Sequence, residues 1–429
     1  MAARPSTVGR LVGAAGIVTG VVGAAALGGM TAQRRAVRHY RDVTAQAVGE
    51  LAGVPDDVAY DSLVPDRSYS VVSDDGVVLA VEEVGPADAP LTVVFAHGWT
   101  LRAGAWHYQR LALSGGWPRP DGAGGAQERT APPDDAGMPV MRLVFYDQRS
   151  HGRSSRAPLG SSTMAHLADD LAAVVATAAP TGPLVVVGHS MGAMALLTLA
   201  GRDERFVQRL VGVGLISTTA TALRQPELTR MLVSGSNPLL KVLTATAARY
   251  PALFERGRRS SRDAVWLLTR TLGFARRDVP GAMVDYLDEM ISSTPADVIA
   301  DFLPVLLSMD QRPALARLTG RPTLILCGDA DRMTPISRSR AMAAALPGAE
   351  MVTVAGAGHM AILEAPAEVN QAVRRLLVRA ADRAGLLADG QASRLLAALQ
   401  DAPAPAAPAD GEPAAGRDGA AETGRAVSR

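Results

Sequence analysis

The residues with the clearest chemical potential lie in one pentapeptide, Gly188-His189-Ser190-Met191-Gly192. Residues 184–187 before it form an apolar run that predicts a buried strand, and residues 193–200 after it predict a helix. A serine between two glycines at a strand-to-helix turn is typical of a nucleophile elbow, a tight turn that leaves no room for bulky neighbours. The pattern therefore predicts that Ser190 is a nucleophile whose hydroxyl stands at the start of a helix.

A serine hydroxyl needs a base within hydrogen-bond reach, and the base needs a partner that orients it. Among the seven histidines, His359 has the most suitable setting, because it lies in a glycine-rich loop after the last predicted strand. Asp331 follows the preceding predicted strand and is the preferred orienting carboxylate, with Asp329 as its rival. The carboxyl ends of parallel strands share one edge, so Ser190, Asp331 and His359 are expected to meet there.

Catalysis by such a serine also requires N–H donors for the oxyanion of a tetrahedral intermediate. The backbone N–H of Met191, directly after the nucleophile, is the first candidate. The second is the backbone N–H of Trp99, in the loop that follows the predicted strand at residues 91–96. Gly98 beside it allows the backbone to approach a ligand closely.

The elements that must position these residues alternate between strands and helices. Strands are predicted at residues 69–72, 77–81, 91–96, 141–146, 184–187, 210–216, 323–327 and 350–354. Helices are predicted at residues 106–113, 163–179, 193–200, 367–381 and 387–399. This alternation predicts an α/β core at residues 60–216 and 322–383, while residues 217–321 have helical periodicity only and predict an inserted helical cap.

Five sequence pieces together resemble the α/β-hydrolase fold family, in its serine-nucleophile, esterase- and lipase-like branch. They occur in family order over roughly residues 68–382 and are His97-Gly98-Trp99, Asp147-Gln148-Arg149-Ser150-His151-Gly152-Arg153-Ser154, the pentapeptide around Ser190, Gly328-Asp329-Ala330-Asp331 and Gly358-His359. The family usually has glycine where Ser150 stands. The resemblance implies an α/β-hydrolase fold with a mostly parallel central sheet, helices on both faces and an inserted helical cap, and a scaffolding role for Asp147, Arg149 and His151.

The resemblance also implies a reaction. We expect a serine hydrolase that cleaves carboxylic esters of hydrophobic substrates through an acyl-Ser190 intermediate, since the apolar, methionine-bearing region 217–321 favours a hydrophobic group. One alternative uses the same triad as a cofactor-free haloperoxidase or perhydrolase, or as a carbon–carbon bond hydrolase. Another is a non-catalytic, hydrolase-like binding protein. The serine argues against family members with an aspartate nucleophile.

The composition of the chain limits which ligands and cofactors it is expected to bind. The 429 residues carry a formal net charge of +1. A chain with so little net charge has no overall electrostatic field that would attract nucleic acid, so no nucleic-acid partner is expected. The single cysteine, Cys327, excludes an internal disulfide framework, and its apolar surroundings predict a buried thiol. Histidine spacing indicates no metal site, and no glycine-rich stretch has the ending of a phosphate-binding loop, so no cofactor is expected.

The ends of the chain differ in composition from its centre. Residues 1–40 hold an uncharged apolar segment at 11–30 between arginines, long enough for one membrane span. We expect membrane association through this segment, with the catalytic domain on the cytoplasmic side because more arginines follow the span than precede it. Secretion after cleavage of a signal peptide is the alternative. Residues 401–429 are rich in alanine, proline and glycine and predict a disordered tail.

Overall fold

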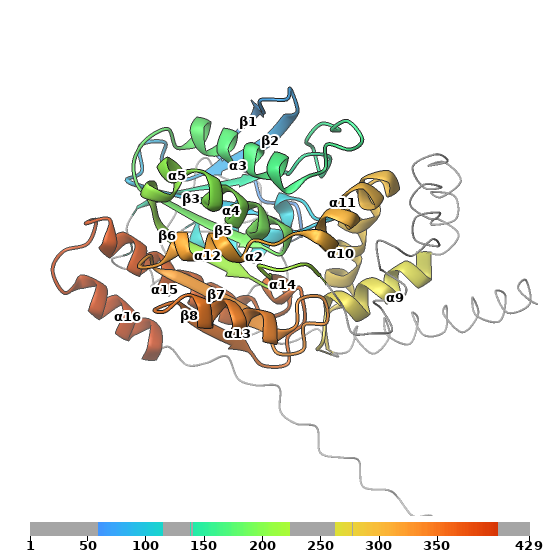
Figure 1. Ribbon diagram of the computed structural model, residues 1–429. Helices are drawn as coiled ribbons and strands as arrows, with labels where there is room; N and C mark the ends of the chain where they lie inside the picture. The colour runs from blue at the N-terminus through green and yellow to red at the C-terminus, as the bar shows by residue number, and fades with distance from the viewer. Residues whose placement is uncertain (1–58, 115–137, 139, 224–261, 277, 402–429) are drawn as a thin grey trace, which may run out of the picture.

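The computed structural model describes residues 59–114, 138, 140–223, 262–276 and 278–401 (Figure 1). These residues contain an eight-stranded sheet in the order β1-β2-β4-β3-β5-β6-β7-β8. Its strands are β1 (Arg67–Val72), β2 (Val78–Val84), β3 (Leu91–Ala96), β4 (Met141–Tyr146), β5 (Leu184–His189), β6 (Leu210–Ile216), β7 (Thr323–Gly328) and β8 (Glu350–Val354). Strand β2 pairs antiparallel with β1 and β4, and every other pair is parallel.

The central strands are apolar along their whole length because helices cover both of their faces. Every residue of β3 and β5 is buried, which is the pattern of a doubly covered parallel sheet. Strand β1 lies at the sheet edge and alternates between exposed and buried side chains over its last residues. Parallel strands that begin and end in register carry their C-terminal loops to a common edge.

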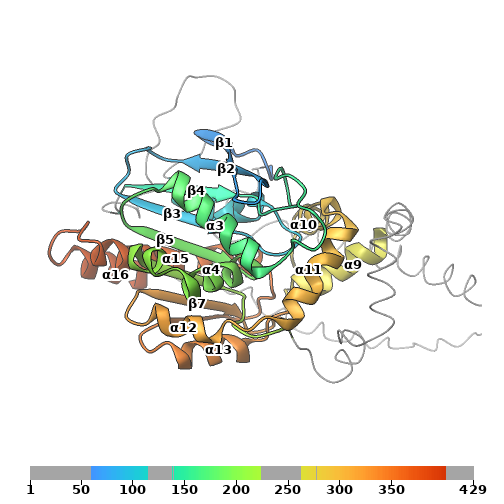
Figure 2. The same ribbon diagram turned by 45° about the horizontal axis from the view of Figure 1, so that its top comes forward.

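Two helical layers enclose the sheet (Figures 1 and 2). Side chains from α3 (Met164–Ala178), α4 (Met191–Arg202), α5 (Glu204–Arg209), α12 (Arg312–Leu315) and α13 (Ile336–Ala345) share one buried cluster with the sheet. Side chains from η1 (Ala103–Trp106), α2 (His107–Leu113), α14 (Ala361–Glu364) and α15 (Pro366–Arg383) belong to a second cluster. The C-terminal α16 (Gln391–Asp401) packs against α15, where Gln371 donates a hydrogen bond to the Leu399 carbonyl.

In the described part of the chain between β6 and β7, three helices lie together at one side of the sheet (Figure 2). They are α9 (Arg262–Gly273), α10 (Gly281–Ser293) and α11 (Ala296–Ser308), called the inserted helices below. The buried Phe302 of α11 packs with Met191 and Met194 at the start of α4. By contrast, α12 and η3 (Ala316–Leu318), which also follow β6, pack against α4 within the core.

The α/β fold class predicted from the sequence is confirmed, including the mostly parallel sheet. The apolar segment at residues 11–30 and nearly all of the 401–429 tail lie outside the described residues. Among the residues that the structure describes, no single helix has the length and apolar character of a membrane span, and only the pair α10 and α11, bent by 92°, passes that test together.

Candidate active site

Ser190 occupies a sharp turn between the end of β5 and the first residue of α4. Its φ of 50° and ψ of −116° are strained for a residue with a side chain. Hydrogen bonds on both sides of the residue hold this conformation. The Ser190 N–H donates to the Ile216 carbonyl at 3.0 Å, and Thr218 Oγ1 donates to the Ser190 carbonyl at 2.8 Å. The end of β6 therefore holds the serine in the geometry of a nucleophile elbow.

The two glycines of the pentapeptide are required by packing. A Cβ on Gly188 would collide with the backbone of Ala193, and one on Gly192 would collide with the carbonyl oxygens of Ala96 and His97. Both collisions involve backbone atoms, so no side-chain rotation could relieve them. The turn therefore requires glycine two residues before and two residues after Ser190, which is the spacing found in the sequence.

His359 and Asp331 meet at the carboxyl ends of β7 and β8. His359 Nδ1 lies 2.9 Å from Asp331 Oδ2, and both side chains are buried. The carboxylate also accepts the backbone N–H groups of Met333 and Thr334 at 2.8 Å each and the Thr334 hydroxyl at 2.7 Å. Burial alone would raise the pKa of Asp331, but the histidine and these donors hold it below its ordinary value.

This hydrogen bond defines the state of the imidazole. A carboxylate only accepts, so Nδ1 of His359 carries the proton and Nε2 keeps its lone pair in the neutral form. The rival carboxylate, Asp329, instead accepts the exposed N–H of Gly356 at 2.8 Å. Asp331 is therefore the acid that orients the histidine.

His189 links the histidine loop, residues 356–360, to the elbow. Its Nε2–H donates to the backbone carbonyl of His359 at 3.0 Å, and the two rings lie 5.0 Å apart between centroids. The residue before Ser190 thus contacts the backbone of His359 directly. Within the described part of the chain, Ser190 Oγ and His359 Nε2 share no hydrogen bond; in ligand-free sites this contact is often long and tightens with substrate.

The two backbone N–H groups predicted as oxyanion donors are free to bind a ligand. Within the part of the chain that the structure describes, neither the Trp99 N–H nor the Met191 N–H donates to a protein group. By contrast, the N–H of Thr100, directly after Trp99, donates to His151, and the N–H of Ala193, two residues after Met191, donates to the Ser190 carbonyl. Met191 also opens α4, whose N-terminus favours negative charge.

The oxyanion loop, residues 97–103, is held by the loop after β4, residues 147–153. The Thr100 N–H donates to His151 Nε2 at 3.1 Å, and the Ala103 N–H donates to Asp147 Oδ1 at 2.7 Å. The Gln148 N–H donates in turn to His97 Nε2 at 2.9 Å. These contacts give the loop after β4 the scaffolding role that the resemblance implied.

The loop after β4 is itself fixed by a buried charge. The guanidinium of Arg149 is fully buried and forms two hydrogen bonds with Asp170 of α3, at 2.6 and 2.7 Å. It also pairs with Asp75 in the turn between β1 and β2, at 2.8 Å. Helix α3 and the turn between β1 and β2 therefore anchor the loop that supports the predicted oxyanion donors.

Three further histidines around the site are neutral. Burial lowers the pKa of His97 to about 4 and those of His151 and His189 to about 3. Each ring uses one nitrogen as a donor to a backbone carbonyl, and His97 and His151 accept a backbone N–H on the other. Their role in the site is to hold backbone in place.

Apolar side chains surround the oxyanion donors. Met191 and Met194 pack with Phe302 of α11, and Trp99 lies against the same cluster. Met164 and Leu167 of α3 complete it on the core side. Trp99 is partly exposed at the edge of this cluster, whereas Met191, Met194 and Phe302 are fully buried.

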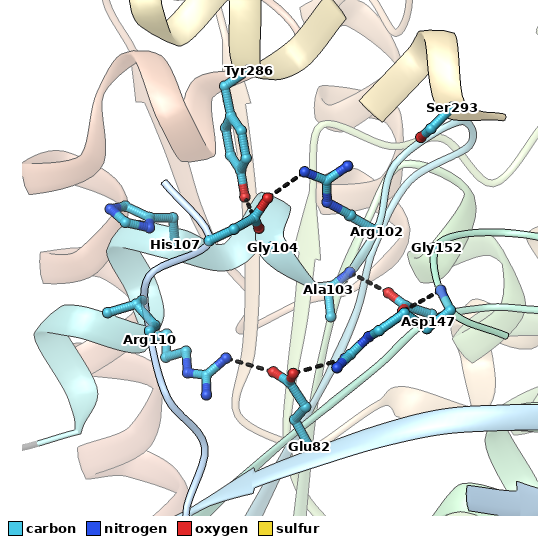
Figure 3. A pocket seen from close by; sticks show the side chains of 13 residues that line it. Glu82, Arg102, Ala103, Gly104, His107, Arg110, Asp147, Gly152, Tyr286 and Ser293 are labelled. Carbon is cyan, nitrogen blue, oxygen red and sulfur yellow. Dashed lines mark hydrogen bonds and ion pairs between the residues drawn. The ribbon is translucent and has the colours of Figure 1, made fainter. Parts of the chain in front are cut away.

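A separate cavity of about 350 Å³, with several charged residues in its lining, opens beside the oxyanion loop (Figure 3). Its charged lining residues are Asp61, Glu82 and Asp147 with Arg102, Arg110 and Arg153. The charges are matched, because Arg110 and Arg153 both bind Glu82 and Arg102 binds Asp61. Ser190, Asp331 and His359 are not among its lining residues, so the cavity is distinct from the serine site.

The structure also shows contacts that the sequence did not suggest. Glu364 is buried below the histidine loop and accepts the N–H of Gly358. Cys327 is buried as expected, with its pKa raised by burial to about 12, and its Sγ lies 3.8 Å from Asp331 Oδ2. No group of metal-ligating side chains occurs among the described residues.

Comparison with known proteins places these features in a family context. The model of the Alpha/beta hydrolase family matches residues 93–372, which is more than half of the chain. The match includes Ser190, Asp331 and His359 and begins before the oxyanion loop.

Two curated proteins and one solved structure illustrate the similarity. The chain is 28% identical to "Putative carbamate hydrolase RutD" of Caulobacter vibrioides, over 59% of this chain and 86% of that protein. It is 26% identical to a pimeloyl-acyl-carrier-protein methyl ester esterase of Xanthomonas oryzae pv. oryzae, over 68% of this chain and 95% of that protein. A thermophilic esterase from Thermogutta terrifontis matches with a TM-score of 0.53 and 24% identity, covering 73% of this chain and 99% of the other.

Proposed function

This chain belongs to the α/β-hydrolase family, and on that basis we propose that it is a serine esterase that acts through an acyl-Ser190 intermediate. The observation that carries the proposal is the Asp331–His359 pair beside the strained turn of Ser190. In this proposal Ser190 is the nucleophile, His359 the base and Asp331 its orienting carboxylate. The N–H groups of Trp99 and Met191 receive the oxyanion.

The first half of the reaction forms the acyl-enzyme. His359 Nε2 accepts the Ser190 proton as Oγ attacks the ester carbonyl carbon. The carbonyl oxygen becomes an oxyanion and accepts the N–H groups of Trp99 and Met191. When the intermediate collapses, the bond to the alkoxy oxygen breaks and His359 returns its proton to the leaving alcohol.

The second half releases the acid. A water molecule gives its proton to His359 Nε2 and attacks the acyl carbon, and the same two N–H groups receive the second oxyanion. Collapse then breaks the bond to Ser190 Oγ, which recovers the proton from His359. Asp331 stabilises the imidazolium that forms in both halves, through the hydrogen bond to Nδ1.

We propose a hydrophobic ester as the substrate. The support is the apolar cluster of Trp99, Met191, Met194 and Phe302 beside the elbow, to which α11 contributes. We therefore also propose that the inserted helices act as a cap. The curated relatives, one named a methyl ester esterase and one a carbamate hydrolase, are consistent with attack on an acyl carbon.

The test is hydrolysis of p-nitrophenyl esters of increasing chain length by the wild type and by Ser190→Ala. We expect the variant to remain folded and to lose activity by at least about 10³-fold, as loss of a triad member does elsewhere. Ser217→Ala is the matched control, because Ser217 is a buried serine with φ of 45° at the end of the neighbouring strand. Unchanged hydrolysis in Ser190→Ala would contradict the proposal.

Two further readouts separate the alternatives. A fluorophosphonate probe should label the wild type and fail to label Ser190→Ala. Absence of labelling in the folded wild type would favour a non-catalytic binding protein. Peroxide-dependent bromination, or cleavage of a diketone, that exceeds ester hydrolysis would favour the haloperoxidase or carbon–carbon hydrolase alternatives.

We also propose membrane association through residues 11–30, with the catalytic domain on the cytoplasmic side. The support is the length of the uncharged segment and the arginines that follow it. Membrane fractionation of the full-length protein and of a form lacking residues 1–40 tests this. Equal recovery of both forms in the soluble fraction would contradict it.

A further inference from the structure

One buried carboxylate close to the proposed base has no part in the reaction described above. Glu364 ends α14 and is 1% exposed. Its Oε2 accepts the N–H of Gly358, the residue before His359. Its Oε1 accepts the N–H groups of Ala275 and Arg276, the first of these at 2.7 Å. A single carboxylate thus binds the histidine loop on one side and residues 273–276, the segment that leaves α9, on the other.

The two segments that Glu364 joins are also in direct contact. The Met360 N–H donates to the Gly273 carbonyl at 2.8 Å. A Cβ on Gly358 would lie within 2.9 Å of the Ala275 nitrogen and the Phe274 carbonyl carbon. The residues on both sides of His359 therefore contact residues 273–276, with no space between the two backbones.

Backbone donors offset part of the cost of burying the Glu364 carboxylate. Burial raises the pKa of its carboxyl, while the three N–H groups favour the charged form. Arg276 contributes from the same segment, because its Nη1 donates to the Glu364 carbonyl at 3.3 Å and its Nη2 pairs with Glu368 at 3.0 Å. Burying a carboxylate is costly unless such partners are present, so loosening residues 273–276 would leave it poorly satisfied.

We propose that Glu364 is a positioning residue that clamps the histidine loop to residues 273–276, so that the placement of His359 depends on the docking of the inserted helices. The inference rests on the proposed function, since it assigns His359 the role of base. His189 fixes the His359 carbonyl from the elbow side, and Glu364 fixes the preceding N–H from the side of the inserted helices. The imidazole is then aimed by two backbone contacts in addition to Asp331.

The test compares Glu364→Gln with Glu368→Gln. Glutamine has the shape of glutamate but one of its two ends is an NH₂ group, so it cannot accept on both sides of the clamp. Glu368→Gln removes a charge that pairs with the same Arg276 and does not contact Gly358. Both variants keep Ser190, Asp331 and His359.

Two measurements are made on the full-length proteins. The first is hydrogen exchange at residues 273–276 and 356–360, which should accelerate together in Glu364→Gln and stay near wild type in Glu368→Gln. The second is fluorophosphonate labelling of Ser190 with kcat and KM for a p-nitrophenyl ester. A displaced base should lower labelling rate and kcat by about 10- to 100-fold and leave KM within about 2-fold.

The outcomes distinguish the clamp from the function it serves. Glu364→Gln with wild-type exchange in both segments, or with faster exchange but wild-type labelling and kcat, would overturn the positioning role. A folded wild type that is not labelled would contradict the proposed function, and exchange would still decide whether the clamp exists. If Glu364→Gln does not fold, Arg276→Ala is the second variant. Arg276 is partly buried, and its loss removes the contacts to the Glu364 carbonyl and to Glu368 that hold residues 273–276. This variant should slow labelling in the same way.

Discussion

The oxyanion side and the base side of the site are built in different ways. On the oxyanion side, residues 97–103 are held by residues 147–153, and both loops follow strands of the core sheet. On the base side, the histidine loop is held by Glu364 and by residues 273–276, which belong to the insertion between β6 and β7. The core therefore supplies most of the hydrogen bonds around the proposed nucleophile and oxyanion donors, whereas the loop of the proposed base is held in large part by the insertion.

This difference predicts which parts of the site a change in the insertion would affect. The hydrogen bonds that hold the elbow come from the core, and the insertion reaches the oxyanion loop through one buried contact, in which Thr294 Oγ1 donates to the Thr100 carbonyl at 3.3 Å. A change in the insertion moves the segment against which Gly358 and Met360 pack. We therefore expect substrate selection and placement of the base to be linked through the inserted helices.

The largest expected effect comes from removing the charge that orients the base. Asp331→Asn should lower kcat by about 10³- to 10⁴-fold, because the amide cannot stabilise the imidazolium and can favour the wrong tautomer of His359. Asp329→Asn is the matched control, since Asp329 lies two residues before Asp331 and accepts the exposed Gly356 N–H instead of the histidine. Steady-state hydrolysis measures both. Comparable losses in the two variants would contradict the assignment of Asp331.

A smaller effect is expected on the oxyanion side. His151→Phe keeps the ring but removes the acceptor of the buried Thr100 N–H, which should lower the free energy of unfolding by about 1–3 kcal/mol. Displacement of the neighbouring Trp99 N–H should lower kcat by about 10-fold. Urea unfolding and hydrolysis measure the two quantities. His166→Phe, at a half-buried position of α3 whose ring contacts Thr163, should have smaller effects on both quantities; equal effects from both substitutions would remove the distinction.

Much of the oxyanion side could be predicted from the sequence, because each element there has a local signature. The Gly188 and Gly192 spacing, the apolar runs of β3 and β5 and the loop after β4 all lie in short, contiguous motifs. Even Ser150, where the resemblance pointed to glycine, has a φ of 64°, a conformation that glycine adopts without strain.

The base side was less predictable because its contacts join distant segments. Asp331 and Asp329 both follow β7, and only the placement of His359 separates them. Glu364 contacts residues 275 and 276, which are 89 and 88 positions away in the chain. Its one local signal was a single glutamate in the apolar stretch 360–365, and no pattern in the sequence shows which backbone N–H groups it meets.

The two buried carboxylates on the base side should respond to pH with opposite sign. The pKa of Asp331 is lowered from 3.8, so its contribution to stability is present above about pH 4 and is lost as the pH falls through the lowered value. The pKa of Glu364 is raised from 4.5, so its charged form costs stability once the pH rises above the raised value. Protonation on acidification removes that cost.

Free energies of unfolding measured between about pH 3 and pH 7 check these signs. Asp331→Asn should reduce the loss of stability at the acid end relative to wild type. Glu364→Gln should remove a gain that the wild type shows on acidification toward pH 4.5. Parallel curves for all three proteins would mean that neither carboxyl changes its pKa on folding.

The smallest effect is expected at Ser150, and it measures how firmly the core holds the oxyanion side. Ser150→Gly relieves a left-handed conformation that costs a residue with a side chain about 1 kcal/mol, but it removes the Oγ acceptor of the Ala157 N–H at 2.9 Å. The two terms should cancel to within about 1 kcal/mol. Ser150→Ala loses the hydrogen bond without relieving the left-handed conformation and should be the less stable variant.

The activity of both variants should change little. Because Asp147, Gln148 and His151 make the contacts to the oxyanion loop, kcat should stay within about 2-fold in both variants. A large loss of kcat in Ser150→Gly would show that the loop after β4 is not rigid enough to preorganise the donors, and the contrast between the two sides would disappear.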